Sequence, residues 1–271
     1  MSRARVLNKG AASWMRSFVL GTIVALAVVP QGRAAPLEAA AENYRHYLID
    51  DIGWALANAR ALRDCLSAHD PDGARKAWVA ARVGWERSEV FTGGFVPELD
   101  QAIDAWPNAS HGFHGIEANL FGASGTDAGA ETDVLIRHLA DLRAQLDHID
   151  LAPQRLLNGI ARLAFEVGGN KADGGESRLS GTSLNDMQSN ADGIALAYRV
   201  IFADAVAAAD PKLAAAARDT IERLQAAVKI DDLRRLDADK LRADSEEFVA
   251  LLQTAAPKIG LDKPTLEEGA R

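Results

Sequence analysis

Apolar residues recur at helical spacing along most of the chain, and no segment has the alternating pattern of a convincing strand. The clearest case runs from about Leu37 to Ala68. Its apolar positions share one helical face: Tyr44, Tyr47, Leu48, Ile52, Ala55, Leu56, Ala59 and Leu62. The pattern predicts a long first helix and an all-α protein.

Aspartate and proline mark several helix starts. Asp70-Pro71 and Asp210-Pro211 each place an N-cap residue before a proline in the first helical position. Asp237 is expected to cap the last helix, and Thr182 or Ser183 the helix that carries Met187. We expect the second helix to end at the glycine pair at 93–94.

Further apolar stripes predict helices over residues 133–149, 153–167 and 183–201, and the total is about eight. Residues 95–110 are expected to be less regular, and the polar stretch at 168–176 to be a loop. Eight helices with short links indicate two antiparallel four-helix bundles. The first would cover about 37–150 and the second about 151–271.

The first 34 residues have the features of a secretory signal peptide. Four basic residues precede an apolar run at 18–29, and Pro30 and small residues follow it. The run is shorter than the roughly 20 residues that span a bilayer. We expect cleavage near Ala34 and a periplasmic protein without stable membrane insertion. A retained membrane anchor is the alternative.

Cleavage would make the chain more acidic. The whole sequence has a formal net charge of −8, and residues 1–34 hold five of the 30 basic residues but none of the 38 acidic ones. The remainder carries 25 basic and 38 acidic residues, a net charge of −13. Such a balance disfavours nucleic acid as a partner and attracts cations. Cys65 is the only cysteine, which excludes intramolecular disulfides and thiolate clusters.

Two helix-compatible segments offer metal-type ligands three residues apart. Glu86 with Glu89, and His114 with Glu117, would each project from one helical face. Carboxylates with one imidazole suit iron, manganese, zinc or calcium. Each residue also has an ordinary interpretation. The two glutamates could belong to a solvated helix face, His114 could be a core histidine, and His111 is a loop histidine or an added ligand.

Four segments together carry a family resemblance over essentially the whole chain after residue 34. They read ARVGWERSE at 81–89, PELD at 97–100, GFHGIEANL at 112–120 and LSGTSLNDMQSNADG at 179–193. In this order they resemble the imelysin-like family, and within it the EfeO- and EfeM-type periplasmic iron-uptake proteins. The resemblance implies a bilobed all-helical fold of paired four-helix bundles, with a cation site in the cleft and a role in iron acquisition.

The resemblance also implies the ligands. By position they would be Glu86, Glu89, Asp100 and His114, with Glu117 either a further ligand or a partner that supports His114. This sequence departs from the family pattern in two places. The segment between Glu89 and Asp100 is shorter than usual, and the residues at 88–90 are Ser-Glu-Val in place of Ile-Glu-Pro.

The function expected from the sequence is therefore capture of a divalent or trivalent cation, iron first, for uptake or buffering. Zinc, manganese, copper and calcium stay open as cargo, and an inner-membrane iron permease system is the expected partner. A binding protein for an acidic polysaccharide or another periplasmic ligand is the alternative, with a basic patch of Arg155, Arg162, Lys171 and Arg178. A metallopeptidase is less favoured because the His-Glu-x-x-His motif is absent. No catalytic residue is expected.

Overall fold

The computed structural model of the chain describes residues 34–105, 111–122, 128–174 and 176–266. Apart from Ala34, the signal peptide that the sequence predicts lies outside the described residues. Within them every regular element is helical, which confirms the all-α prediction. No helix in the described ranges combines the length and apolar character needed to cross a membrane.

Ten α-helices and three short π- or 3-10-helical turns make up the regular structure of the described residues. In chain order they are α1 (Ala34–Ser67), α2 (Pro71–Phe95), α3 (Pro97–Ile103), α4 (Gly112–Phe121), α5 (Ala128–Gln145), α6 (Pro153–Gly168), α7 (Ser183–Ala197), the π-helical turn η1 (Tyr198–Phe202), α8 (Ala203–Ala209), α9 (Pro211–Val228), the 3-10 turn η2 (Leu233–Arg235), α10 (Ala238–Ala255) and the 3-10 turn η3 (Ala256–Ile259).

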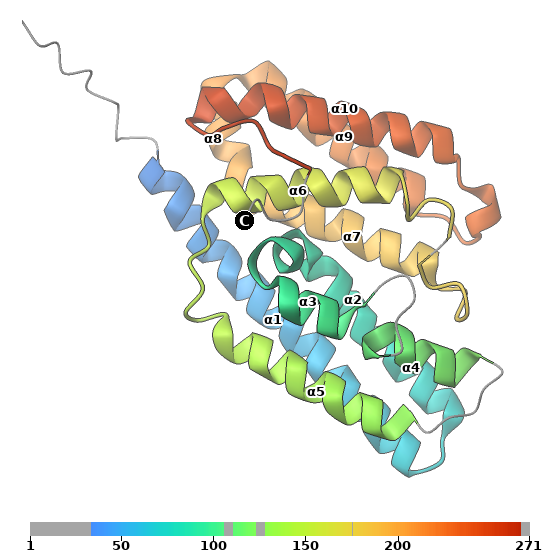
Figure 1. Cartoon of the computed structure of the whole chain (residues 1–271). Coiled ribbons are helices and arrows are strands. Elements are labelled where there is room, and N and C mark those ends of the chain that lie inside the picture. Colours follow the sequence, from blue (N-terminus) through green and yellow to red (C-terminus); the bar gives the residue numbers. More distant parts are fainter. Residues whose placement is uncertain (1–33, 106–110, 123–127, 175, 267–271) are drawn as a thin grey trace, which may run out of the picture. The chain divides into compact units, whose positions relative to one another are not determined.

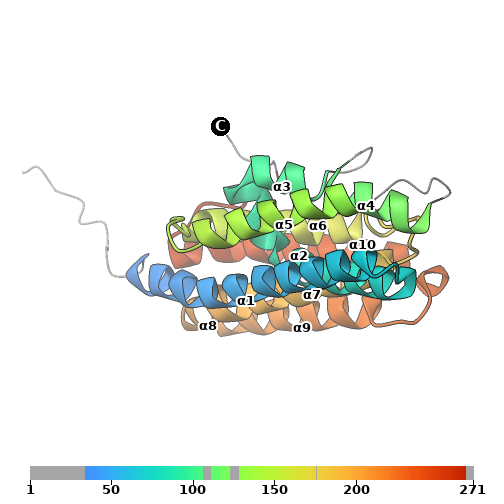
Figure 2. The same ribbon diagram turned by 90° about the horizontal axis from the view of Figure 1, so that it is seen from below.

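Helix α2 lies between two groups of helices. It packs along α1, which α5 also contacts, and on its other side it contacts α6 and α7 (Figure 1). Helices α9 and α10 cover the far side of α7 and α6. The short α3 lies against α5 (Figure 2). The described residues lie within one compact unit, and the predicted division into two four-helix bundles near residues 150–153 stays a prediction.

The aspartate caps form as the sequence predicts. The side chain of Asp70 accepts a hydrogen bond from the backbone N–H of Gly73, and Asp210 accepts one from Leu213. Asp237 caps α10 in the same way. Each bond satisfies a backbone donor that the first helical turn leaves without a partner.

The second helix ends one residue beyond the predicted glycine pair. Helix α2 continues through Gly93 and Gly94 to Phe95. Gly93 is buried there, and a Cβ atom at this position would lie 2.8 Å from Nη2 of Arg162. The glycine thus leaves room for the guanidinium of Arg162 and does not break the helix. The helix ends at Val96, before Pro97 disfavours further helical geometry.

The stretch after α2 is also more regular than predicted, because Pro97 opens the helix α3 in its first turn. Asp104 is the C-cap residue of α3, and its N–H donates to the carbonyl of Asp100. Residues 106–110 lie outside the described ranges. The end of α3 thus sets the position of the Asp104 side chain.

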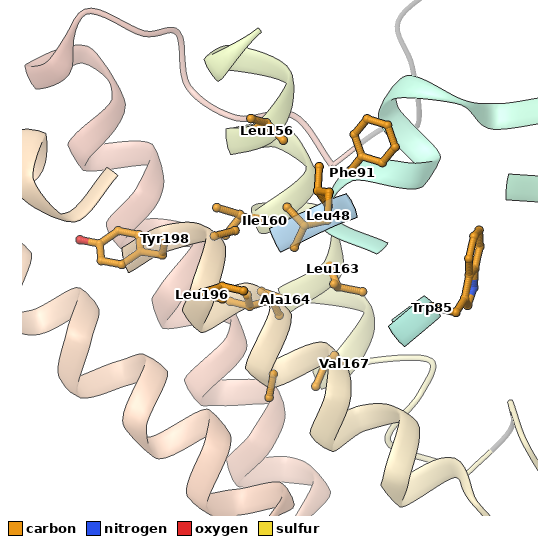
Figure 3. Packing of buried hydrophobic residues seen from close by; sticks show 14 of the residues in the cluster. Leu48, Trp85, Phe91, Leu156, Ile160, Leu163, Ala164, Val167, Leu196 and Tyr198 are labelled. Carbon is orange, nitrogen blue, oxygen red and sulfur yellow. The ribbon is translucent and has the colours of Figure 1, made fainter. Parts of the chain in front are cut away.

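The apolar face of α6 fixes the contact between the two groups of helices. Figure 3 shows the buried side chains of α6 from Leu156 to Val167, with Phe91 of α2 and Leu196 of α7 close to them. Leu156, Ile160 and Leu163 have no measurable solvent exposure. Burying this face is the main source of stability for such a helix pair, and it holds α2 rigidly where its acidic residues meet α7.

Candidate metal centre

The middle of α2 carries two acidic residues into the protein interior. Glu86 is fully buried and Glu89, one turn later, is largely buried with a side chain 13% exposed. Asn190 of α7 joins them, since its Nδ2 donates to Glu86 Oε2 at 2.9 Å and to Glu89 Oε2 at 2.8 Å. A solvated helix face is therefore the wrong interpretation of Glu86.

His114, on the first turn of α4, is held between two carboxylates. Its Nε2 lies 3.1 Å from Oδ1 of Asp104, and its Nδ1 lies 3.3 Å from Oε2 of Glu117. The other oxygen of Glu117 accepts hydrogen bonds from the N–H and the hydroxyl of Ser180, at 2.8 and 2.7 Å. Glu117 thus fixes the orientation of the imidazole ring. His111 precedes α4 and is exposed, as expected of a loop histidine.

The link between α6 and α7 supplies two buried charged residues, Lys171 and Glu176. The Nζ of Lys171 lies 2.8 Å from Oε2 of Glu176, 3.0 Å from Glu86 Oε2 and 2.8 Å from Glu89 Oε2. The ammonium group therefore lies among three carboxylates that come from α2 and from the link itself.

These contacts produce two overlapping groups of ligand atoms. Oxygen atoms of Glu86, Glu89, Asp104 and Glu176 all lie within 4.8 Å of one another. Asp104 and Glu176 form a second group with a nitrogen of His114 within the same limit. The structure thus brings Glu86, Glu89 and His114 of the sequence-predicted set to one place. Asp104 and Glu176 join them, and sequence reasoning missed both.

The remaining two predicted residues take other positions. Glu117 belongs to neither group and contacts the site through His114. Asp100 also belongs to neither group, but it lines a cavity of about 290 Å³ that opens beside the cluster. Glu89, Asp104 and Glu176 line the same cavity. The cavity gives the acidic cluster a route to solvent.

A fully buried arginine of α2 contacts the carboxylates of the cluster. Arg82 donates from Nη1 to Asp104 Oδ1 at 2.8 Å and from Nε to Asp186 Oδ1 at 3.2 Å, and it also pairs with Glu86. Its Nη2 lies 3.5 Å from Glu176. A planar guanidinium with five N–H donors can satisfy several carboxylates at once, so Arg82 holds the acidic groups together.

The contact network contains more acidic than basic groups. Three cationic side chains, Arg82, Lys171 and His114, pair with the carboxyl groups of Glu86, Glu89, Asp104, Glu117, Glu176 and Asp186. Unbalanced carboxylates away from water either hold protons or attract a further cation. The site therefore favours the uptake of positive charge.

The pKa values of Glu89 and Glu176 show the same imbalance. Burial raises the pKa of Glu176 to about 7. Burial, together with the neighbouring carboxylate of Glu86, raises the pKa of Glu89 well above its ordinary value. Burial alone would lower the pKa of His114, but the ion pair with Asp104 outweighs it and raises the pKa to about 9. Acidic groups whose ionised forms lack enough partners show such upward shifts.

The basic patch suggested by the sequence is not a free cationic surface. Lys171 is enclosed by carboxylates, and Arg162 pairs with Glu166 at 2.9 Å and donates to the carbonyl of Glu89. Arg155 covers the ring of Phe95 at 4.2 Å. Two of the four basic residues thus face the acidic cavity, which does not favour an anionic polymer there.

Two residues of the 179–193 segment, Asp186 and Asn190, support the site from α7. Asp186 accepts a hydrogen bond from Ser177 at 2.5 Å as well as from Arg82, and burial raises its pKa to about 6. Asn190 donates to Glu86 and Glu89. The family-like segment therefore positions the acidic residues of α2.

The family comparison covers most of the chain. Residues 40–111 and 108–259 match a family model, Peptidase_M75, whose description is Imelysin. Both matched ranges contain residues of the centre, since the first includes Glu86, Glu89 and Asp104 and the second His114, Glu117 and Glu176.

Curated proteins that are similar to this chain carry iron-uptake names. The chain is 32% identical over 162 residues to an iron uptake system component EfeO of Yersinia pseudotuberculosis, with 56% of this chain and 43% of that protein covered. It is 29% identical over 161 residues to an iron uptake system component EfeM of Pseudomonas syringae, with 56% of each covered. The chain thus aligns with about half the length of these relatives.

A solved structure shares the fold. A protein assigned as an iron-regulated protein A precursor, from Parabacteroides distasonis, superimposes with a TM-score of 0.67 over 83% of this chain and 95% of its own. The identity is 16%, so this likeness concerns the helical architecture.

Proposed function

This chain belongs to the imelysin family, and we propose that it captures a divalent or trivalent metal cation, iron first, in the periplasm. The ligands would come from the carboxylate group of Glu86, Glu89, Asp104 and Glu176, with His114 adjoining the last two. The ion is cargo, held for delivery to an iron uptake system or for buffering.

One observation carries the proposal. Carboxylate oxygens from α2, from the end of α3 and from the link before α7 lie within 4.8 Å of one another, and the imidazole of His114 adjoins two of them. Helices far apart in sequence thus converge on a group of metal-type donors. Since acidic groups outnumber basic ones in this network, a multivalent cation would complete its charge balance.

The donor set fits iron better than softer metals. It holds carboxylates and one imidazole, and Cys65 lies on α1 outside both ligand groups. Oxygen ligands with one nitrogen suit iron and manganese, and a thiolate is not required. Glu117 would orient His114 through Nδ1, as the hydrogen-bonded partners of metal-bound histidines do.

The relatives support the direction of this proposal. The relatives that align with this chain over about half of their own length are named iron uptake system components. We extend that role to this chain. Delivery to an inner-membrane permease would then follow capture. The peptidase name of the family is not extended, because neither ligand group in the described residues contains a second histidine, which a zincin-type site needs.

Metal content and calorimetry test the proposal. The protein without residues 1–34 would be titrated with Fe²⁺ under anaerobic conditions, and with Mn²⁺, Zn²⁺, Cu²⁺ and Ca²⁺, beside the variant His114→Ala. We expect stoichiometric binding that weakens at least tenfold in the variant. His111→Ala is the matched control, because this exposed histidine precedes the same helix, and it should bind as the wild type does. Absence of binding to any of these ions would refute metal capture.

A further inference from the structure

Lys171 occupies the place in the acidic cluster that a cation would take. Its ammonium nitrogen lies 2.8–3.1 Å from carboxylate oxygens of three different glutamates, Glu86, Glu89 and Glu176. These three belong to the group of four whose ligand atoms lie within 4.8 Å of one another. The lysine side chain is 10% exposed, so water contributes little to solvating the charge.

An ammonium group and a metal ion cannot share these oxygens. Metal ions bind oxygen ligands at roughly 2.0–2.6 Å, so the carboxylates would have to close around the ion. With the ammonium in place at the present distances, a second cation at the centre of the same three glutamates would meet both steric overlap and charge repulsion. Binding there requires that Lys171 leave.

We propose that Lys171 is a built-in competitor for the cargo ion: its ammonium group pairs with Glu86, Glu89 and Glu176 when no metal is bound, and an incoming multivalent cation displaces it. The inference rests on the proposed function, since it concerns the same site. Exchange of one positive charge for two or three favours the metal, whereas a monovalent ion gains no charge over the lysine. Lys171 thus selects against Na⁺ and K⁺.

The position of Lys171 in the fold suits this exchange. It lies in the link between α6 and α7, next to the exposed Asn170, and it lines the cavity that opens to solvent. A flexible four-carbon stem can carry the ammonium outward along that cavity. Arg82 differs, because it lies on α2, is fully buried and bonds three carboxylates directly. Arg82 stays in the site while Lys171 moves.

Removal of the competing charge tests the proposal. In Lys171→Met the stem remains and the charge is lost, so we expect Mn²⁺ to bind at least tenfold more tightly than to the wild type in calorimetry. Lys240→Met is the matched control, because Lys240 pairs with Asp244 on α10 and is exposed. Its affinity should equal that of the wild type.

Chemical labelling of the wild-type protein tests displacement without any substitution. Lysines would be acetylated briefly with and without Mn²⁺, and their labelling rates compared by mass spectrometry. We expect the ion to raise the rate at Lys171 several-fold and to leave the exposed Lys240 unchanged. An unchanged or lower labelling rate at Lys171 would overturn the displacement. This test does not need Lys171→Met to fold, because it uses the wild-type protein.

The outcomes separate this inference from the proposed function. If the wild type binds Mn²⁺ and Lys171→Met binds it equally or more weakly, the competitor role is wrong and metal capture stands. If only Lys171→Met binds, the ion does not displace the lysine in the natural protein, and both the displacement and metal capture fall. If neither variant nor wild type binds any of the ions, metal capture falls and the competitor role falls with it.

Discussion

The indole of Trp85 donates a hydrogen bond from Nε1 to Oδ2 of Asp104 at 2.7 Å. The tryptophan is fully buried in α2, one residue before Glu86, and Asp104 lies at the end of α3. The bond therefore couples the packing of the core to the carboxylate that also contacts His114. A tryptophan of the core thus also positions a candidate ligand.

Trp85→Phe should weaken metal binding. The change removes the donor to Asp104 but keeps an aromatic ring, and loss of a hydrogen bond to a charged group costs about 1.5–3 kcal/mol. We expect at least a tenfold loss of Mn²⁺ affinity in calorimetry. Trp78→Phe is the control, because its Nε1 donates to the backbone carbonyl of Phe113. Equal affinities in the two variants would contradict the positioning role.

Arg82→Met should destabilise the fold strongly. Removing the guanidinium leaves the buried carboxylates of Glu86, Asp104 and Asp186 without their main partner, which costs about 3–5 kcal/mol for a broken buried ion pair. Urea unfolding at neutral pH measures the loss. Arg223→Met, which breaks a pair near the surface with Asp244, should lose about 1 kcal/mol or less. Similar losses in the two variants would refute the central role of Arg82.

Gly159→Ala should weaken the contact between α6 and α2. A Cβ atom at Gly159 would lie 1.8 Å from the carbonyl oxygen of Val90, so the helices must separate. We expect a loss of about 2 kcal/mol or more in the free energy of unfolding. In Gly94→Ala, on α2, the added Cβ meets no atom within 4 Å, and better helix propensity should add about 0.5–1 kcal/mol. Thermal or urea unfolding should therefore show a loss of stability in Gly159→Ala and a gain in Gly94→Ala. A change of the same sign in both variants would be evidence against close packing at Gly159.

Asp51 should give the stability of the fold a pH dependence outside the metal site. Burial raises its pKa to about 6, against an opposing effect of Arg87, from an ordinary value of 3.8. The folded state thus holds this proton more tightly than the unfolded state does. Its stabilising contribution is complete below about pH 4 and is lost as the pH rises through 6.

Asp51→Asn removes this dependence. Relative to the wild type, the variant should gain about 1–2 kcal/mol in unfolding free energy between pH 4.5 and 7.5, after allowance for the lost pair with the partly exposed Arg87. Urea unfolding across that range measures the difference. A difference that does not change with pH would show that the folded state does not shift this pKa.

Local sequence patterns predicted the helices well because their causes are local. The capping aspartates at 70, 210 and 237 bond to backbone N–H groups three residues onward, which the sequence spacing alone determines. The end of α2 was predicted one residue early because Gly93 leaves room for the side chain of Arg162 and does not break the helix. A glycine that provides space for another helix has the same sequence signature as one that ends a helix.

The site was predicted only in part for a related reason. Glu86, Glu89 and His114 have helical spacings that suggest paired ligands, whereas Asp104 and Glu176 have no such spacing. They reach the site because α3 ends at Asp104 and because the link before α7 folds back over α2. Lys171 was read as part of a basic patch, since sequence alone does not show which carboxylates surround it.

Anomalous diffraction from crystals of the protein grown with Mn²⁺ tests the central claim most directly. We expect one strong peak within roughly 2.0–2.6 Å of carboxylate oxygens from the group Glu86, Glu89, Asp104 and Glu176, next to His114, with Lys171 moved from its present position. A protein that binds no Mn²⁺, or a peak remote from this group, would contradict the assignment of the metal centre.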